Sequence, residues 1–319
     1  MVPYAGPPMS RVRLSPAGYR RVTLVALGSL TAIVVTGGAV RLTGSGLGCP
    51  DWPNCDDGRL VAPLEYHAMV EFVNRTVTGL VSLAVIVAVL ASLARVPRRR
   101  DLVRLSLGLV AGVVGQIVLG GLTVLFELRP PFVMAHFLLS MMIVANAVAL
   151  HWRATLPDEA PRREPGVSPA GRQLGRITLA LGALVVFLGT VVTAAGPHGG
   201  DEDVPRLAVE VGRAAQLHGL AVVLLLAAVV TLLVVLRRDG APAADVRRGR
   251  VLLGVLVAQA AVGYVQYFTG VPVLLVGAHI AGATAAWAAL VRFQLGAADR
   301  GPGGAELAAA AADAVPAPA

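Results

Sequence analysis

Eight long apolar stretches constrain what this chain can fold into more than any other feature. A helix that crosses a bilayer needs about 20 mostly apolar residues. Stretches of about that length occupy residues 22–41, 71–94, 103–125, 132–152, 174–195, 212–236, 251–269 and 272–293. Only 14% of the 319 residues are charged, which argues against a disordered chain, a nucleic-acid-binding domain and a disulfide-rich secreted scaffold. The sequence predicts an all-α, polytopic membrane protein with eight transmembrane helices.

The arginines predict how these helices are oriented. The chain has 27 basic residues, and most lie in the N-terminal segment, in alternate loops and in the C-terminal tail. By the positive-inside rule both termini are then cytoplasmic, in what we expect to be a bacterial cell membrane. The loops 42–70 and 196–211 would lie on the outer side. They are rich in Gly, Pro and Asp, so we expect the active site toward the outer face.

A repeated pattern predicts that the chain is a duplicated four-helix unit. Three pairs of identical residues share one offset: Gln116 and Gln259, Gly120 and Gly263, His136 and His279. Two parallel repeats would then be related by an axis along the membrane normal. The predicted divisions are a disordered cytoplasmic tail at 1–18, an N-terminal half at 19–152, a cytoplasmic linker at 153–173, a C-terminal half at 174–296 and a second disordered tail at 297–319.

Three histidines lie inside the predicted membrane boundary, near its outer side. They are His136, His218 and His279, and a histidine at such depth usually faces a bundle interior or a cofactor. A single one is more often a helix-to-helix hydrogen bond than a ligand. A facing pair, His218 and His279, instead suits the axial ligation of a haem iron. Zinc suits the pair less, because no cysteine or acid accompanies it. The repeat would place a histidine at position 74, where the chain has Asn74.

The second apolar stretch begins with a stripe of polar residues on one helical face. His67, Glu71 and Asn74 are spaced i, i+4 and i+7. Glu71 either pairs with Arg75, four residues later, or serves as an acid, a base or a charge stabiliser in the first-half cavity. Arg41 and Arg75 either extend to lipid headgroups or bind carboxylates such as haem propionates.

The outer loop 42–70 contains the only two cysteines, Cys49 and Cys55. They lie outside the reducing cytoplasm, and two prolines between them permit a small disulfide loop. Two free thiols are the alternative. A disulfide would either brace the loop or exchange with a redox partner.

Several of these motifs resemble the haem A synthase family, in its shorter bacterial form. The most specific is the run Thr36-Gly-Gly-Ala-Val-Arg41-Leu-Thr-Gly-Ser-Gly-Leu-Gly-Cys49-Pro-Asp-Trp-Pro53. Glu71-Phe-Val-Asn74-Arg75 and Gly196-Pro-His-Gly-Gly-Asp201 are also similar to the family's motifs. The resemblance covers about residues 20–295 and implies that haem O is converted to haem A by oxidation of one porphyrin methyl to a formyl group, in successive hydroxylations.

The resemblance also implies roles for particular residues. His218 and His279 would ligate a resident haem b, and His136 would lie at the substrate-haem site. Glu71 matches a glutamate implicated in catalysis, and the two cysteines match the family's outer-loop pair. The implied partners are a haem O synthase that delivers the substrate, the cytochrome oxidase assembly machinery that receives haem A, membrane lipid, and an electron donor such as a quinol.

Asn74 departs from the family pattern, because many members have histidine there. Three accounts stay open: Asn74 contacts the substrate haem weakly, His67 substitutes for the missing ligand, or His136 holds the haem alone. The alternative function is a b-type membrane electron carrier that accepts electrons from quinol. Against this alternative, one half has a pair of histidines and the other half does not. Two equivalent electron-transfer sites would not need that asymmetry, whereas a cofactor-binding half and a substrate-binding half would.

Overall fold

The regular structure of this protein is helical throughout the residues that its computed structural model describes, which are 13–56, 58–158 and 168–298. Eight α-helices follow one another: α1 (Pro16–Leu42), α2 (Tyr66–Ala94), α3 (Arg100–Leu125), α4 (Pro130–Thr155), α5 (Pro169–Ala195), α6 (Val211–Arg238), α7 (Ala243–Phe268) and α8 (Val273–Ala298). Each is long and apolar enough to cross a membrane. The predicted fold class, an all-α polytopic membrane protein, is confirmed.

Helices α1 and α5 begin in the same way. Ser-Pro-Ala-Gly occurs at 15–18 and again at 168–171, and in both copies the serine side chain accepts a hydrogen bond from the glycine N–H. The proline occupies the first helical turn, where its missing N–H costs nothing. Our sequence analysis missed this match, which adds to the case for a duplicated unit. The duplication itself stays a prediction.

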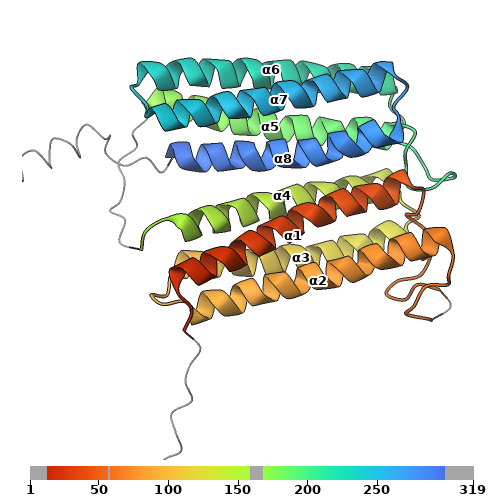
Figure 1. Cartoon of the computed structure of the whole chain (residues 1–319). Coiled ribbons are helices and arrows are strands. Elements are labelled where there is room, and N and C mark those ends of the chain that lie inside the picture. Colours follow the sequence, from red (N-terminus) through yellow and green to blue (C-terminus); the bar gives the residue numbers. More distant parts are fainter. Residues whose placement is uncertain (1–12, 57, 159–167, 299–319) are drawn as a thin grey trace, which may run out of the picture.

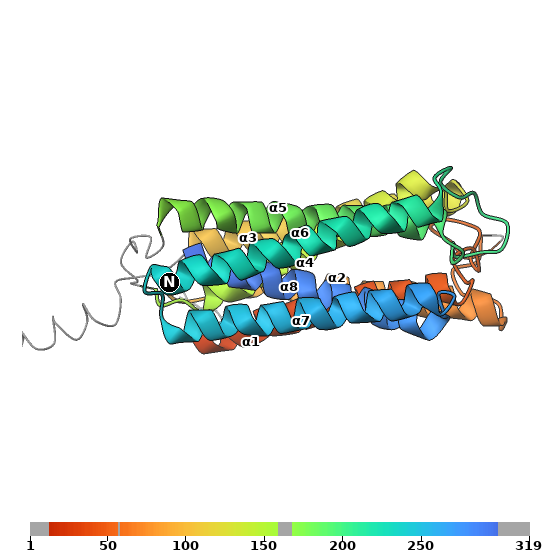
Figure 2. The ribbon, with the colours of Figure 1, turned by 90° about the horizontal axis from the view of Figure 1, so that it is seen from above.

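The helices pack side by side in two groups, α1–α4 and α5–α8 (Figure 1). All of them run roughly along the same long axis (Figure 2). Each group has its own core of aliphatic side chains, which includes Leu109 and Leu150 in the first and Val229 and Leu290 in the second. A third cluster, which includes Val34, Met141, Val144 and Val291, joins the groups along α1, α4 and α8. The indole N–H of Trp287 also donates to the Met141 carbonyl, at 2.9 Å.

The outer surface of the bundle is apolar. Large side chains such as Leu83 and Leu90 on α2, Val223 on α6 and Leu274 on α8 are exposed. On a water-soluble protein so much exposed apolar area would cause aggregation. In a bilayer the hydrocarbon covers this area, and helices satisfy their own backbone hydrogen bonds.

Several helices are longer than the apolar stretches predicted. α1 begins at Pro16, so the prediction of a disordered tail at 1–18 is wrong for residues 13–18. α2 begins at Tyr66 and α7 at Ala243, several residues before the predicted starts. Helices of 26 to 29 residues extend to about 40 Å, which exceeds the hydrocarbon thickness and carries their polar ends into the headgroup region.

The predicted linker and tails lie partly outside the described residues. Helical structure covers 153–155, 169–173 and 297–298, while 1–12, 159–167 and 299–319 are not described. Just before the undescribed segment 159–167, the Asp158 carboxylate pairs with the Arg95 guanidinium at 2.6 Å, and the Arg95 side chain is only 1% exposed. Residues just after α4 therefore hold a buried charge at this end of the bundle.

Candidate functional site

A cavity of about 410 Å³ lies between α1–α5 and α8, toward the end of the bundle that carries the disulfide loop. This volume is within the usual range for small-molecule and cofactor pockets. Its lining is mostly apolar. The polar side chains in it include Arg41, Glu71, Asn74, Arg75, Gln116, His136, Ser140, Arg206 and His279. We predicted a cavity in the first half alone, but residues of α5 and α8 complete it.

His136 on α4 faces this cavity across a glycine of α3. A Cβ added at Gly120 would lie 3.4 Å from the imidazole Cε1, so the glycine leaves room for the ring. The Nδ1 atom of His136 is buried and has no hydrogen-bond partner among the described residues. Unpaired buried nitrogens are costly and uncommon, which makes the ring a candidate ligand.

His218 on α6 and His279 on α8 face each other, as predicted, with ring centroids 6.5 Å apart. Each ring packs on a glycine of the preceding helix: a Cβ at Gly189 would lie 3.3 Å from His218, and one at Gly263 would lie 3.0 Å from His279. The His218 Nδ1 is also buried without a partner among the described residues.

The separation of these two rings fits a metal bound between them. A metal–imidazole bond is about 2 Å long, and adding both ring radii gives roughly 6–6.5 Å between the centroids of two axial ligands. The described residues contain no group of three or more His, Cys, Asp or Glu that could hold a metal ion. A metal held between these rings would therefore have two imidazoles as its protein ligands, which would suit a haem iron whose other ligands belong to the macrocycle.

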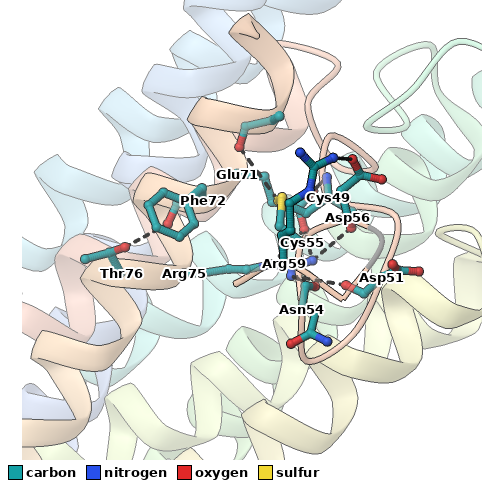
Figure 3. Close-up of a disulfide and its surroundings, with 11 residues drawn as sticks. Cys49, Asp51, Asn54, Cys55, Asp56, Arg59, Glu71, Phe72, Arg75 and Thr76 are labelled. Atoms are coloured by element: carbon teal, nitrogen blue, oxygen red, sulfur yellow. Dashed lines mark hydrogen bonds and ion pairs between the residues drawn. A yellow bond between two sulfur atoms is a disulfide. The ribbon is translucent and has the colours of Figure 1, made fainter. Parts of the chain in front are cut away.

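Glu71 is buried and fully paired (Figure 3). Its Oε1 accepts from Arg75 Nη2 at 2.6 Å and from Nε at 3.1 Å, and its Oε2 accepts from the Cys49 N–H at 2.9 Å. The ion pair weighed in the sequence analysis is present. The bond to Cys49 was not foreseen, and it gives Glu71 a second structural task in holding the loop.

Arg75 joins α2 to the disulfide loop. Besides Glu71, it donates to the carbonyl oxygens of Cys49, Asp51 and Asn54 at 3.0, 3.2 and 2.9 Å. Three backbone carbonyls and a carboxylate therefore depend on one guanidinium, whose planar set of five N–H donors suits such a task.

Cys49 and Cys55 form a disulfide, and both are buried against Ala62 and Ala68. Between them, Trp52 extends into the cavity lining, where its ring lies 5.2 Å from the Arg75 guanidinium. The loop therefore closes one end of the cavity. Sequence reasoning missed Trp52, although tryptophan within a tight loop at a membrane interface was a usable signal.

Two further guanidinium groups line the cavity. Arg41 donates to the Thr193 carbonyl at 2.7 Å, and its buried Nε has no partner among the described residues. Arg206, in the loop between α5 and α6, donates to the Pro197 carbonyl at 2.7 Å. We predicted Arg41 and missed Arg206, which has no motif around it. The cavity thus has three arginines and one carboxylate, Glu71, among its charged groups.

The other two predicted residues on the α2 stripe have different positions. Asn74 lines the cavity, and its Oδ1 accepts from Thr36 at 2.9 Å. His67 is exposed, and its Nδ1 contacts Ser45 Oγ at 2.9 Å. His67 is not among the residues that line the cavity. The stripe expected from helical spacing is therefore only partly directed into the site.

Residues 20–68 and 60–198 match a family described as Cytochrome oxidase assembly protein (COX15-CtaA), and these ranges cover more than half of the chain. Similar proteins named Heme A synthase include those of Symbiobacterium thermophilum, 35% identical over 56% of this chain and 60% of the relative, and Shewanella oneidensis, 29% identical over 54% and 53%. That of Listeria welshimeri is 31% identical over 38% of this chain and 40% of the relative. The matched regions thus span 40% to 60% of these relatives. The chain belongs to this cytochrome oxidase assembly family, the family of the haem A synthases.

Proposed function

We propose that this protein converts haem O to haem A, oxidising one porphyrin methyl to a formyl group for use by cytochrome oxidase. The observation that carries the proposal is an asymmetry between the halves. Two facing imidazoles lie 6.5 Å apart in α6 and α8, whereas His136 lines a cavity in which no second histidine of α1–α4 takes part. Such a difference suits one retained cofactor and one exchangeable substrate.

His218 and His279 are the residues that would hold a haem b. Their rings have the separation that two axial ligands need, and glycines on α5 and α7 leave room beside them. When bound, haem b supplies one-electron transfer. The chain has no dinucleotide motif, so the electrons come from an outside donor, for which a membrane quinol is the candidate.

His136 would ligate the iron of the substrate haem from within the cavity. Of the three accounts of the missing second ligand, substitution by His67 has the least support, since His67 contacts Ser45 outside the cavity lining. Asn74 lines the cavity but shares its carbonyl oxygen with Thr36. Weak or single ligation is consistent with a substrate that has to leave. Arg41 and Arg206 are suited to bind the propionates, because guanidinium groups match carboxylates in geometry.

Glu71 is the proposed catalytic residue. Two successive hydroxylations of the methyl group give a hydrated aldehyde, which loses water to leave the formyl group. Each hydroxylation removes two electrons from the carbon; with dioxygen as the oxidant, these two electrons and two from the outside donor reduce one O2, so that each hydroxylation yields one hydroxyl group and one water. A fixed carboxylate in a cavity of low dielectric stabilises positive charge that develops at that carbon, or orients water toward it. Arg75 and the Cys49 N–H hold the carboxylate in one position, and this preorganisation is compatible with either role.

The orientation and the partners belong to the same proposal. The Arg-rich end, where both described termini lie, would face the cytoplasm, and the disulfide end would face outward. A haem O synthase would deliver the substrate, and the cytochrome oxidase assembly machinery would receive haem A. The halves 19–152 and 174–296 would be the substrate and haem b units.

Expression beside a source of haem O, followed by chromatography of the extracted haems, tests the function. We expect haem A to appear only when the protein is present. Recovery of haem b and haem O alone would contradict the proposal and favour the alternative, an electron carrier that leaves its haem unchanged.

A further inference from the structure

The helix pairs α3–α4 and α7–α8 share the spacing of Gln, Gly and His but differ in what the glutamine contacts. Gln259 Nε2 lies 2.9 Å from His279 Nδ1 and 2.7 Å from the His279 carbonyl oxygen. Gln116 Nε2 lies 3.0 Å from the His136 carbonyl oxygen but 2.7 Å from Ser140 Oγ in place of the ring. Only the second-half glutamine therefore holds the imidazole of its histidine.

Two substitutions between the repeats account for this difference. At the shared offset of the repeat, Leu139 corresponds to Gly282 and Ser140 corresponds to Ala283. A Cβ at Gly282 would collide with the Gln259 amide oxygen, so glycine is what leaves room for the amide beside the ring. Ala283 has no hydroxyl to compete for the amide N–H.

In the first half the serine has the opposite effect. The Ser140 hydroxyl accepts from Gln116 and donates back to the His136 carbonyl oxygen at 3.0 Å. The amide is thereby kept away from the imidazole, and the His136 Nδ1 has no partner among the described residues. The Nδ1 atom of His279 thus contacts a glutamine amide in the second half, whereas the Nδ1 atom of His136 has no such contact in the first half.

We propose that Gln259 is a positioning residue for His279, and that Leu139 and Ser140 prevent Gln116 from acting likewise on His136. The inference rests on the proposed function, in which His279 ligates a retained haem b and His136 a substrate haem. An acceptor on the second ring N–H fixes the rotation of a histidine ligand and raises its basicity. The Gln259 amide nitrogen lies toward His279 Nδ1. With iron on Nε2 that Nδ1 would carry the proton, and a half-turn of the amide would present its oxygen as the acceptor.

The functional consequence concerns how long each haem stays. A ring held on both sides keeps its ligand geometry when the iron–nitrogen bond breaks briefly, which favours rebinding. A ring without that partner loses the geometry more readily. The glutamine contact therefore favours retention at His279, and its absence favours exchange at His136.

Four variants test this inference in the intact protein. Gln259→Leu removes the amide, and Ala283→Ser installs the hydroxyl that diverts it in the first half. Gln116→Leu is the matched control in the other repeat, and Ala285→Ser adds a hydroxyl at an exposed position of the same helix. The readouts are the low-spin electron paramagnetic resonance spectrum of haem b, its midpoint potential, and its rate of transfer to excess apomyoglobin.

For Gln259→Leu we expect about 10-fold faster transfer or more, a shifted spectrum and a higher midpoint potential, as for other residues that support a metal ligand. Ala283→Ser should change all three in the same direction, by less. Both controls should match the wild type. Because Ala283→Ser is a small change, it decides the matter if Gln259→Leu does not fold.

Three results would overturn the inference, and the last of them is distinguishable from the first two. If the wild type purifies with haem b and Ala283→Ser and Gln259→Leu match it in all readouts, Gln259 does not position His279. The same conclusion follows if Gln116→Leu shifts the haem b signals as strongly as Gln259→Leu. If the wild type holds no haem b at all, the proposed cofactor is wrong and the inference falls with it.

Discussion

Replacing Arg75 by leucine should release the disulfide loop from α2. The substitution removes the ion pair to Glu71 and the hydrogen bonds to three loop carbonyls, and it leaves a carboxylate that is only 8% exposed without its cation. Breaking a buried ion pair in this way costs about 3–5 kcal/mol. Because the Arg75 side chain is 19% exposed, we take the lower end, about 3 kcal/mol. At tenfold per 1.4 kcal/mol, local opening of the loop should become about 100-fold more frequent.

Amide hydrogen exchange, followed by mass spectrometry of loop peptides, measures that opening. The amides of the disulfide loop should exchange about 100-fold faster in Arg75→Leu, while those in the middle of the helices keep their rates. Arg59→Leu is the matched control, since Arg59 pairs with Asp56 in the same loop but its side chain is 64% exposed. Exposed pairs contribute about 0–1 kcal/mol, so the control should change exchange by at most about fivefold. Unchanged loop exchange in Arg75→Leu, or an equal change in both variants, would refute the assigned role of Arg75.

Three further predictions concern the loops. Thiol reagents should label neither Cys49 nor Cys55 in unreduced membranes and both after reduction; full labelling before reduction would contradict the disulfide. Asp158→Asn should lower the free energy of unfolding by about 3 kcal/mol, because it leaves the buried Arg95 without its anion, and an unchanged melting temperature would count against that pair. Exchanging 159–167 for a flexible linker of equal length should preserve haem A output. Severe loss with normal membrane insertion would show that this segment, next to Asp158, has a role beyond connection.

The membrane helices were predictable because the bilayer imposes one rule on all of them. Each needs a run of apolar residues as long as the hydrocarbon is thick, and that run is visible in the sequence. Helix ends were not predictable in the same way. Residues 243–250 of α7 include one aspartate and three arginines, so they are not part of an apolar run, yet they are helical.

The histidines of the site were predictable, but their surroundings were only partly so. That His218 and His279 face each other was predictable, because both lie at a similar depth in the membrane on two helices of the C-terminal half. The participation of Arg206 did not, since it depends on how a loop folds back over the cavity. The extension of the cavity to α5 and α8 depends on how the group α5–α8 packs on the group α1–α4. That packing could not be predicted from any local sequence pattern.

Glu71 shows where residue-by-residue reasoning has its limit. Spacing alone indicated both an ion pair with Arg75 and a place in the cavity, and these were weighed as alternatives. In the structure Glu71 has both, together with a bond to the Cys49 N–H. A loop contact between residues 22 positions apart carries no periodicity by which a sequence could reveal it.

The central claim is that one half of the protein acts on a substrate haem while the other retains haem b. The most direct test is to purify the Glu71→Gln variant from cells that make haem O and to extract the haems bound to it. The amide keeps an oxygen for the Cys49 N–H but removes the negative charge. We predict haem b at the wild-type level, no haem A, and haem O or its alcohol in the place of the product. Haem A at the wild-type level would contradict the account, because Glu71 would then serve only to hold Arg75 and the disulfide loop.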